Sequence, residues 1–259
     1  MKINITKTHG TKNHFLIIEN KDKNPLLHNK DFIQKICNQK SDERIDGVLI
    51  LSDNHLDYKM DYYNNDGSWE TMCANGARCA GLYISDKYHK KIMEFEAGDG
   101  IHAIEVLENN LIKLNMKQPK YCSDEVFVQG EKGFHVDSGA THFVVEYPNI
   151  TDDIVRDLGS KIRHDKQFHP RGINVNFYEV INQNEINVKT YEKGIEDLMM
   201  SCGSGSVASA FHLAMKKRIK SPLKVNVPGG NLIIEFNQDW DSVNLIGPAK
   251  IEYSYKIEV

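Results

Sequence analysis

One arrangement of residues occurs twice in the chain, first in Met72-Cys73-Ala74-Asn75-Gly76-Ala77-Arg78-Cys79-Ala80 and again in Ser201-Cys202-Gly203-Ser204-Gly205-Ser206-Val207-Ala208-Ser209. In both copies a cysteine precedes a small, turn-forming tripeptide that ends in glycine, and a run with helical spacing follows. Backbone N–H groups at the start of a helix attract anions and favour a thiolate over a thiol. The arrangement therefore predicts a site with two thiol acid/base groups, Cys73 and Cys202.

The segments around these cysteines also repeat in the same order. The matching segments are 10–17 with 139–145, 46–51 with 172–177, 57–63 with 186–191, and 95–101 with 227–232. From the His-Phe pair to the motif cysteine is about 60 residues in both halves, and from that cysteine to the next glycine turn is about 25. Matches in the same order with nearly equal spacing indicate an internal duplication.

We therefore expect an α+β fold of two pseudo-symmetric domains with similar topology. Each domain would be a mostly antiparallel sheet wrapped around a central helix, with the active site in the interdomain cleft. The first domain is predicted to cover 1–117 together with a returning C-terminal strand at about 250–259, and the second to cover 118–249. Spacing and capping residues predict helices from Asn29 or Asp31 to about 37, over 76–88, between 152 and 162, and from 202 to about 217.

Composition excludes several classes of protein. The 259 residues carry a net charge of −4, so there is no basic surface of the kind that binds nucleic acid. No window approaches the run of about 18 apolar residues that spans a membrane, and the N-terminus lacks a signal-peptide core. The five cysteines include no CxxC pair, which argues against a zinc site or a disulfide framework. These features predict a cytoplasmic protein with reduced thiols.

Two thiols can invert a stereocentre if they lie on opposite sides of a carbon next to a carboxylate. One thiolate removes the α-proton from one face, and the other thiol delivers a proton to the opposite face. Two helix starts would hold the carboxylate and stabilise the enolate-like carbanion. We therefore expect an amino-acid substrate and no cofactor or metal.

Other cysteines and the histidines have simpler interpretations. A cysteine outside such a setting is more often a small buried hydrophobe, and we assign Cys37, Cys79 and Cys122 to that class. His14 and His142 lie at matched strand positions. We interpret His14 as a core histidine, and His142 either as a core residue or as a supporting proton partner.

At these residues the chain resembles the diaminopimelate epimerase family over nearly its whole length. The motifs that carry the resemblance are 9–15 (HGxxNxF in the family), 64–68 (NxDGS), 73–79 (CGNGARC), 172–177 (GxNVNF), 191–197 (YERGVED) and 201–205 (SCGTG). The resemblance implies an isomerase that interconverts LL- and meso-2,6-diaminopimelate, on the route to lysine and peptidoglycan, without pyridoxal phosphate or metal. It also implies a possible homodimer.

The resemblance assigns roles to single residues. Cys73 and Cys202 would be the acid/base pair, and Asn13 would support the reacting end of the substrate. The backbone that would hold the reacting carboxylate belongs to Ala74, Asn75, Gly203 and Ser204. The residues that would bind the distal amino-acid end are Asn64, Asn174, Glu192 and Lys193, with Glu192 on the amino group.

Several positions depart from the family pattern, mostly at the distal end. Lys193 replaces an arginine and so loses the bidentate fork for a carboxylate, and Ala140 replaces an asparagine. Leu198-Met199 replaces a Glu-Thr pair, and Ala74 replaces a glycine. Two alternatives therefore stay open: a racemase of the same family that acts on another amino acid, such as histidine or hydroxyproline, and a catalytically silent amino-acid-binding relative. The presence of both thiols argues against the silent relative, since binding a carboxylate needs only the N–H groups.

Overall fold

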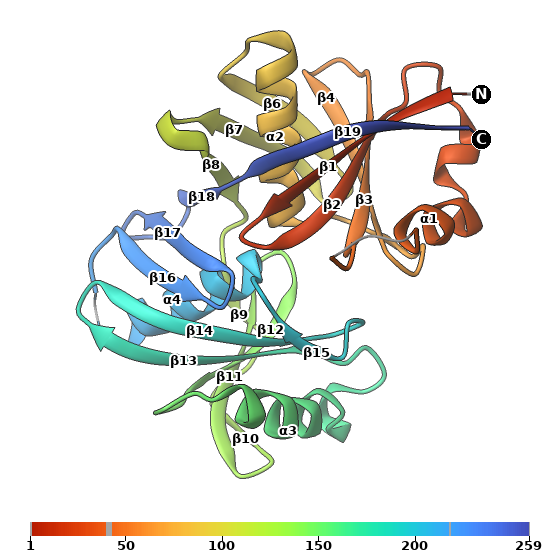
Figure 1. Cartoon of the computed structure of the whole chain (residues 1–259). Helices are drawn as coiled ribbons and strands as arrows, with labels where there is room; N and C mark the ends of the chain where they lie inside the picture. Colours follow the sequence, from red (N-terminus) through yellow and green to blue (C-terminus); the bar gives the residue numbers. More distant parts are fainter. Residues whose placement is uncertain (1, 40–42, 218, 259) are drawn as a thin grey trace. The chain divides into compact units, whose positions relative to one another are not determined.

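The computed structural model describes residues 2–39, 43–217 and 219–258, so the outermost residues of the predicted domains, 1 and 259, lie outside it. The chain divides into two compact units, Met1–Leu114 with Gly247–Val259, and Asn115–Ile246. The chain passes from one unit to the other after residues 114 and 246, three residues before the predicted bounds at 117 and 249. Figure 1 shows the elements of both units in sequence colours.

The first unit contains two helices and one curled sheet. Its elements are β1 (Lys2–Gly10), β2 (Asn13–Glu19), η1 (Pro25–His28), α1 (Lys30–Cys37), β3 (Gly47–Ser52), β4 (Tyr58–Asn64), β5 (Trp69–Glu70), α2 (Ala74–Tyr88), β6 (Ile92–Ala97), β7 (Gly100–Val106), η2 (Glu108–Asn110), β8 (Leu111–Met116) and β19 (Lys250–Glu258). Neighbouring strands are antiparallel except for β2–β3 and β4–β6. Each parallel pair is joined by a segment that contains a helix, because a parallel connection needs a crossover.

The second unit repeats this order. Its elements are β9 (Lys120–Tyr121), β10 (Val126–Val128), β11 (Glu131–Asp137), β12 (Thr141–Glu146), α3 (Asp152–Arg163), η3 (Lys166–Phe168), β13 (Asn174–Asn182), β14 (Glu185–Glu192), β15 (Asp197–Met199), α4 (Gly203–Lys217), β16 (Leu223–Val227), β17 (Gly230–Phe236) and β18 (Val243–Pro248). The parallel pairs are again the two that enclose helices, β12–β13 and β14–β16. The duplication read from the sequence is therefore visible strand by strand.

One helix in each unit lies within the curl of its sheet. In the first unit α2 packs against β1, β2, β3, β4, β7 and β19, and in the second unit α4 packs against β11, β12, β13, β14, β16 and β17. Small residues make this enclosure possible: ten residues of α2 are buried, including Ala77, Ala80 and Gly81. The other two helices, α1 and α3, are amphipathic and cover strands outside the curl.

The capping residues explain where the outer helices begin. Asn29, not Asp31, caps α1, and its side chain accepts hydrogen bonds from the N–H groups of Asp31 and Phe32. Thr151 caps α3 in the same way through Ile154. By contrast, the residue before α2 is a cysteine whose side chain makes no cap hydrogen bond. The inner helix of the first unit therefore begins at a residue whose side chain does not cap the first turn.

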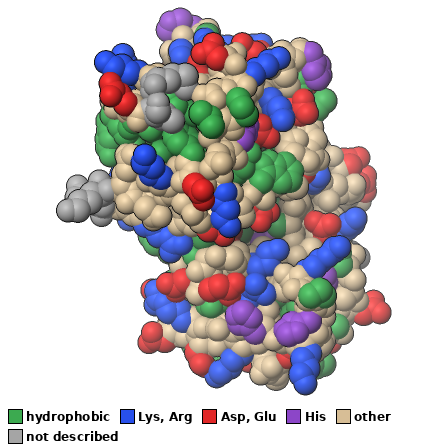
Figure 2. Space-filling model, turned by 90° about the vertical axis from the view of Figure 1, so that its right-hand side faces the viewer, with side chains coloured by type: hydrophobic (Ala, Val, Ile, Leu, Met, Phe, Trp, Pro, Cys, Tyr) green, Lys and Arg blue, Asp and Glu red, His purple; other side chains and the backbone are tan. Residues whose placement is uncertain are grey.

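The surface agrees with the composition. On the face drawn in Figure 2, acidic and basic side chains are interspersed and do not form a field of one sign. The helices in the described part of the chain are all too short or too polar to cross a bilayer.

Candidate active site

Cys73 occupies the N-cap position of α2 and is half-buried. Its backbone is extended, with φ −129° and ψ 117°, and its carbonyl accepts the first intrahelical hydrogen bond, from the Ala77 N–H at 2.8 Å. The N–H groups of residues 74–76, which come before Ala77, therefore take no part in the i to i−4 hydrogen bonds of the helix. The expected helix at 76–88 begins two residues earlier, so Ala74 and Asn75 belong to its first turn, where N–H groups favour anions.

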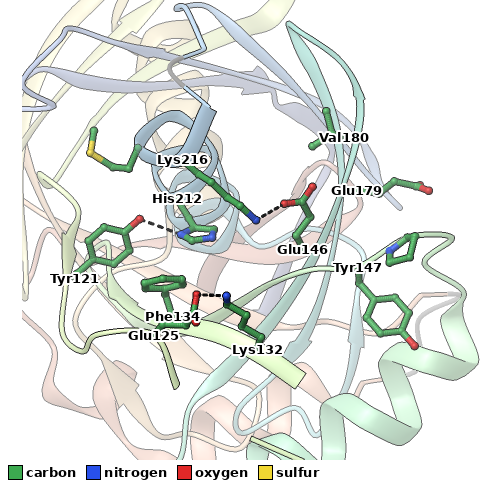
Figure 3. A pocket seen from close by; sticks show the side chains of 12 residues that line it. Tyr121, Glu125, Lys132, Phe134, Glu146, Tyr147, Glu179, Val180, His212 and Lys216 are labelled. Carbon is green, nitrogen blue, oxygen red and sulfur yellow. Dashed lines mark hydrogen bonds and ion pairs between the residues drawn. The ribbon is translucent and has the colours of Figure 1, made fainter. Parts of the chain in front are cut away.

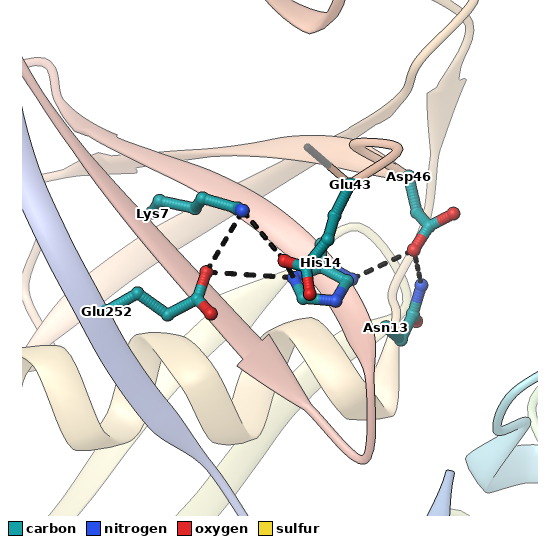
Figure 4. A network of polar contacts seen from close by, with 6 residues as sticks. All are labelled: Lys7, Asn13, His14, Glu43, Asp46 and Glu252. Carbon is teal, nitrogen blue, oxygen red and sulfur yellow. Dashed lines mark hydrogen bonds and ion pairs between the residues drawn. The ribbon is translucent and has the colours of Figure 1, made fainter. Parts of the chain in front are cut away.

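Asn75 and Asn13 contact each other directly. The Asn75 Nδ2 donates to Asn13 Oδ1 at 3.0 Å, and both side chains are buried. Asn13 Nδ2 in turn donates to Asp46 Oδ2 at 2.6 Å, and the His14 N–H donates to the same oxygen at 2.9 Å (Figure 4). Asp46 thereby fixes the orientation of the Asn13 amide. Burial of the Asp46 side chain raises the pKa of its carboxyl group.

Arg78 completes this network from inside α2. Its guanidinium is fully buried and donates to Thr11 Oγ1 at 2.8 Å and to Asn75 Oδ1 at 2.9 Å. Thr11 lies in a two-residue turn between β1 and β2 in which Thr11 and Lys12 have φ values of 52° and 60°. A β-branched residue is strained at positive φ, so contacts from outside the turn must hold it there. At Gly10 a Cβ would lie 2.9 Å from the Asn75 carbonyl oxygen, which explains a glycine at this close approach.

A second charged cluster lies beside this network. Lys7 Nζ lies 2.8 Å from Glu43 Oε2 and 3.2 Å from Glu252 Oε2, and His14 Nδ1 lies 3.3 Å from the same Glu43 oxygen (Figure 4). Burial alone would lower the pKa of Lys7, but the hydrogen bonds to the two carboxylates outweigh it and raise the pKa. Ligand atoms of His14, Glu43 and Glu252 lie within 4.8 Å of one another, as in a metal site, but Lys7 already supplies a positive charge to both carboxylates. His14 is buried as expected, with carboxylates rather than apolar side chains around its ring nitrogen.

Cys202 is buried directly before α4, and Gly203 and Ser204 form the first turn of that helix. The Ser206 N–H donates to the Cys202 carbonyl at 3.0 Å, the same relation that links Ala77 to Cys73. The Ser204 hydroxyl lies 3.6 Å from Cys202 Sγ and 2.9 Å from His142 Nε2. Each of the two units thus presents a thiol at the start of its inner helix.

His142 belongs to the surroundings of Cys202. The ring is fully buried in β12, and burial lowers its pKa to about 3. A neutral imidazole at working pH cannot act as a positive partner for a thiolate, but it can orient the Ser204 hydroxyl. The structure therefore places His142 in the core and beside Ser204, and its supporting role stays a prediction.

Three of the four residues predicted to bind the distal end lie together in the second unit. The Asn174 Oδ1 accepts a hydrogen bond from the Lys193 N–H at 2.9 Å, and its Nδ2 donates to the Thr141 carbonyl at 3.3 Å. Glu192 is the last residue of β14 and precedes Lys193, whose side chain is exposed. Asn174, Glu192 and Lys193 therefore form one local group.

Asn64 lies in the first unit at the end of β4. Its Oδ1 accepts from the Tyr62 hydroxyl at 2.7 Å, and its Nδ2 donates to Ser68 Oγ at 3.0 Å. The amide therefore stabilises the turn that follows β4. Among the positions that depart from the family, Ala140 lies in the turn before β12, and Met199 is buried in β15 beside the half-buried Leu198.

The remaining cysteines do not all follow the expectation. Cys37 and Cys79 are buried, and burial raises their pKa values to about 12 and about 11, so they are unreactive thiols. The expectation is wrong for Cys122, which is exposed. It follows the two-residue strand β9 on the surface, and no periodic pattern in the sequence marks so short a strand.

Sequence reasoning missed the residues that hold the predicted ones in place. Arg78 and Asp46 were not singled out, and neither was Asn176, whose Nδ2 donates to the Gly205 carbonyl at 3.3 Å at the start of α4. A signal for Arg78 existed, because it is the one charged residue in the small, apolar run 74–82. For Asp46 and Asn176 we find none, since both side chains reach partners far away in the sequence.

A cavity of about 970 Å3 lies in the second unit. It is bounded by α4, β11, β12 and β13, and no predicted site residue lines it (Figure 3). Its polar side chains pair with one another: Lys216 with Glu146 at 2.7 Å, and the Tyr121 hydroxyl with His212 Nδ1 at 2.9 Å. The predicted chemistry therefore does not reside in this cavity.

Known proteins resemble the chain along nearly its whole length. A family model described as diaminopimelate epimerase matches residues 5–122 and 134–252, one segment in each half. A curated diaminopimelate epimerase from Flavobacterium psychrophilum is 34% identical, over 97% of this chain and 98% of that protein. Another, from Methanocella arvoryzae, is 33% identical over 100% of this chain and 98% of that protein.

Solved structures share the fold at low sequence identity. A phenazine biosynthesis protein of the PhzF family from Bacillus anthracis matches with a TM-score of 0.77 at 12% identity, over 100% of both chains. A hydroxyproline epimerase from Agrobacterium vitis matches with a TM-score of 0.73 at 12% identity, over 99% of this chain and 92% of that one. These likenesses show the fold alone, and they confirm the predicted α+β architecture with two similar halves.

Proposed function

The chain belongs to the diaminopimelate epimerase family, and from this premise we propose that it is an isomerase that interconverts LL- and meso-2,6-diaminopimelate, a step toward lysine and peptidoglycan. Cys73 and Cys202 are the two bases of this reaction. The observation that carries the proposal is that both predicted cysteines stand at the start of the inner helix of their unit, in equivalent positions of the repeat.

The reaction needs a carboxylate holder and two proton carriers. The N–H groups in the first turns of α2 and α4, at Ala74, Asn75, Gly203 and Ser204, hold the α-carboxylate, with Asn13 supporting Asn75. The thiolate of one cysteine removes the α-proton and becomes a thiol. The thiol of the other delivers its proton to the opposite face and becomes a thiolate, so proton number and charge are conserved.

The distal end of the substrate is bound by a set that this chain modifies. We place the distal carboxylate at Asn64, Asn174 and Lys193, and the distal amino group at Glu192. Lys193 carries a single point charge where an arginine would offer two parallel donors, so we expect weaker orientation of that carboxylate. This departure favours testing one alternative, a racemase of the same family for another amino acid.

The experiment is solvent deuterium exchange with a panel of amino acids. We expect deuterium at the α-carbon of diaminopimelate and no comparable exchange with histidine or hydroxyproline, read by mass spectrometry. Exchange with one of those and none with diaminopimelate would contradict the substrate assignment.

Cysteine variants test the residue assignment in the same assay. Cys73→Ala and Cys202→Ala are each expected to abolish epimerisation, because either thiol alone cannot serve both faces. Cys122→Ala is the matched control, since this thiol is exposed, and it should keep full activity. Full activity in either of the first two variants would refute the two-base assignment. Thermal stabilisation of the wild type by diaminopimelate without deuterium exchange would indicate a silent binding protein.

Cytoplasmic location, independence of cofactors and homodimer formation stay predictions.

A further inference from the structure

The turn between β14 and β15 carries Lys193 and follows directly on Glu192, two of the residues that we place at the distal end of the substrate. The Glu196 N–H donates to the Glu192 carbonyl at 2.8 Å and closes this turn. Gly194 and Glu196 both have positive φ, 88° and 57°. A glutamate is strained in this region, so contacts from outside the turn must hold it in this conformation.

Arg163, the last residue of α3, supplies such a contact. Its side chain is only 14% exposed, and its Nη2 donates to Glu196 Oε1 at 2.9 Å. The same oxygen accepts the Gly194 N–H at 3.0 Å, and the other carboxylate oxygen lies 3.2 Å from His164 Nε2. Charge-assisted hydrogen bonds are stronger than those between neutral groups, so Arg163 fixes the carboxylate that ties the turn together.

The guanidinium also lies against the segment that leads to the third distal residue, Asn174. A Cβ at Gly172 would lie 1.6 Å from Arg163 Nη1, so the arginine packs directly on that backbone. Gly172 has a φ of 66°, which glycine adopts without strain. Two residues later Asn174 begins β13, and its Oδ1 accepts the Lys193 N–H at 2.9 Å. Arg163 therefore contacts both segments that form the local group of Asn174, Glu192 and Lys193.

We propose that Arg163 is a positioning residue for the distal end of the substrate. This inference rests on the proposed function. Through Glu196, Arg163 holds the turn in the conformation in which Glu192 and Lys193 bind the distal amino and carboxylate groups of diaminopimelate. A lysine side chain is long and flexible, so a fixed backbone at Lys193 limits the positions that its ammonium group can reach.

Arg156 offers a matched control on the same helix. Its Nε donates to Asp197 Oδ1 at 2.9 Å, so it also joins α3 to a carboxylate after β14. Both side chains are about half exposed, at 50% and 52%, and Asp197 lies beyond the turn as the first residue of β15. An exposed ion pair of this kind contributes little, so its removal should leave the turn in place.

The first test is the steady-state kinetics of diaminopimelate epimerisation. The distal end does not change in the reaction, so contacts with it bind substrate and transition state equally and appear in KM. We expect Arg163→Met to raise KM about tenfold and to change kcat by less than about threefold. Arg156→Met should leave both constants unchanged. A residue that only stabilises the fold would lower the amount of active enzyme and leave KM unchanged.

Further variants show whether the effect passes through Glu196. Arg163→Lys keeps a charge opposite Glu196 and should return KM to within about threefold of the wild type. Glu196→Ala should raise KM as much as Arg163→Met, and the double variant no further, because both changes break the same contact. Glu196 is exposed, so its variant tests the proposal even if Arg163→Met does not fold.

Hydrogen exchange of the ligand-free protein tests the turn without substrate. The N–H groups of Lys193, Gly194 and Glu196 each donate a hydrogen bond that holds the turn. We expect a peptide that covers 193–197 to exchange roughly tenfold faster in Arg163→Met and at the wild-type rate in Arg156→Met, read by mass spectrometry.

An unchanged KM in Glu196→Ala or in folded Arg163→Met, or an equal rise in Arg156→Met, would overturn the proposal. Unchanged hydrogen exchange of the turn would overturn it as well. Failure of the proposed function has a different sign, which is no deuterium in diaminopimelate with the wild-type chain. The positioning role for this substrate would then fall with it, and hydrogen exchange would still report whether Arg163 holds the turn.

Discussion

At the scale of single residues, the two proposed bases have unlike neighbours. Cys73 precedes a helix that buries the guanidinium of Arg78, whereas Cys202 stands 3.6 Å from the Ser204 hydroxyl, which lies 2.9 Å from His142 Nε2. An imidazole with a pKa of about 3 gains no proton near neutral pH, so its contribution is the placement of that hydroxyl. A supporting role of His142 toward the second thiol would therefore act through Ser204.

We expect Ser204→Ala to slow epimerisation and to destabilise the second unit. Loss of the hydroxyl removes the Cys202 contact and leaves His142 Nε2 buried without its partner, which costs about 1–3 kcal/mol. Chemical unfolding and the initial rate of deuterium exchange measure the two effects.

Ser209→Ala is the matched control, because Ser209 is another buried serine of α4, with its hydroxyl donating to the Gly205 carbonyl at 2.9 Å. It should lower stability modestly and leave the exchange rate unchanged. Equal losses of rate in the two variants would mean that the Ser204 hydroxyl acts only by stabilising the helix.

The amino-acid sequence predicts residues marked by their immediate neighbours in the chain. It does not predict residues whose role depends on partners far away in the sequence. The position of Cys73 and Cys202 at helix starts was predictable because cysteine, small tripeptide and helix are consecutive in the chain. Asp46 was missed because it holds Asn13 across 33 positions, and Arg78 holds Thr11 across 67. Only folding of the sheet around the helix brings such pairs together.

At the scale of elements, the two proposed bases lie at the starts of the inner helices, and the outer helices cover the sheets. The positions of α1 and α3 were predictable because both helices have a clear apolar stripe, and α1 also has a typical capping residue, Asn29. The start of α2 was placed two residues late, because Cys73 makes no side-chain cap that would mark it. The short strands β5, β9 and β15 were missed, since two or three residues carry no period.

Burial of neutral histidines around α4 makes the second unit sensitive to acid. Burial lowers the pKa of His142 to about 3 and that of His212 to about 4, against 6.5 for an exposed histidine. The unfolded chain therefore binds protons that the folded unit cannot bind as the pH falls below 6.5. Stability is fully present above pH 6.5 and declines toward pH 4, by up to about 1.4 kcal/mol per pH unit for each histidine.

Urea unfolding between pH 6.5 and 5 measures this slope, in a range where most carboxylates stay ionised. Trp240 is buried in the second unit, so its fluorescence in a Trp69→Phe background reports that unit. His212→Gln should reduce the slope by about half, because one of two strongly shifted histidines is gone. An unchanged slope would show that His212 is protonated in the folded unit.

At the scale of the whole molecule, the chain is a duplicated unit whose copies kept their topology and diverged in chemistry. The strand order, the two parallel pairs and the position of the inner helix are common to both units. The duplication was predictable from spacing, since the numbers of residues between matching motifs are nearly equal in the two halves. The predicted unit boundaries lie three residues late because the chain passes between the units inside the strands β8 and β18. The alternation of side chains in each strand continues across the boundary and does not mark it.

The central claim is that one thiol from each unit serves one face of the same α-carbon. Epimerisation of LL-diaminopimelate in deuterium oxide, stopped at low conversion, tests it most directly. If one thiol takes the substrate proton and the other delivers a solvent deuteron, the meso product carries deuterium at the inverted carbon while the remaining LL substrate carries none. Protium kept in the product, or deuterium in the recovered substrate as early as in the product, would mean that a single base serves both faces and would contradict the account.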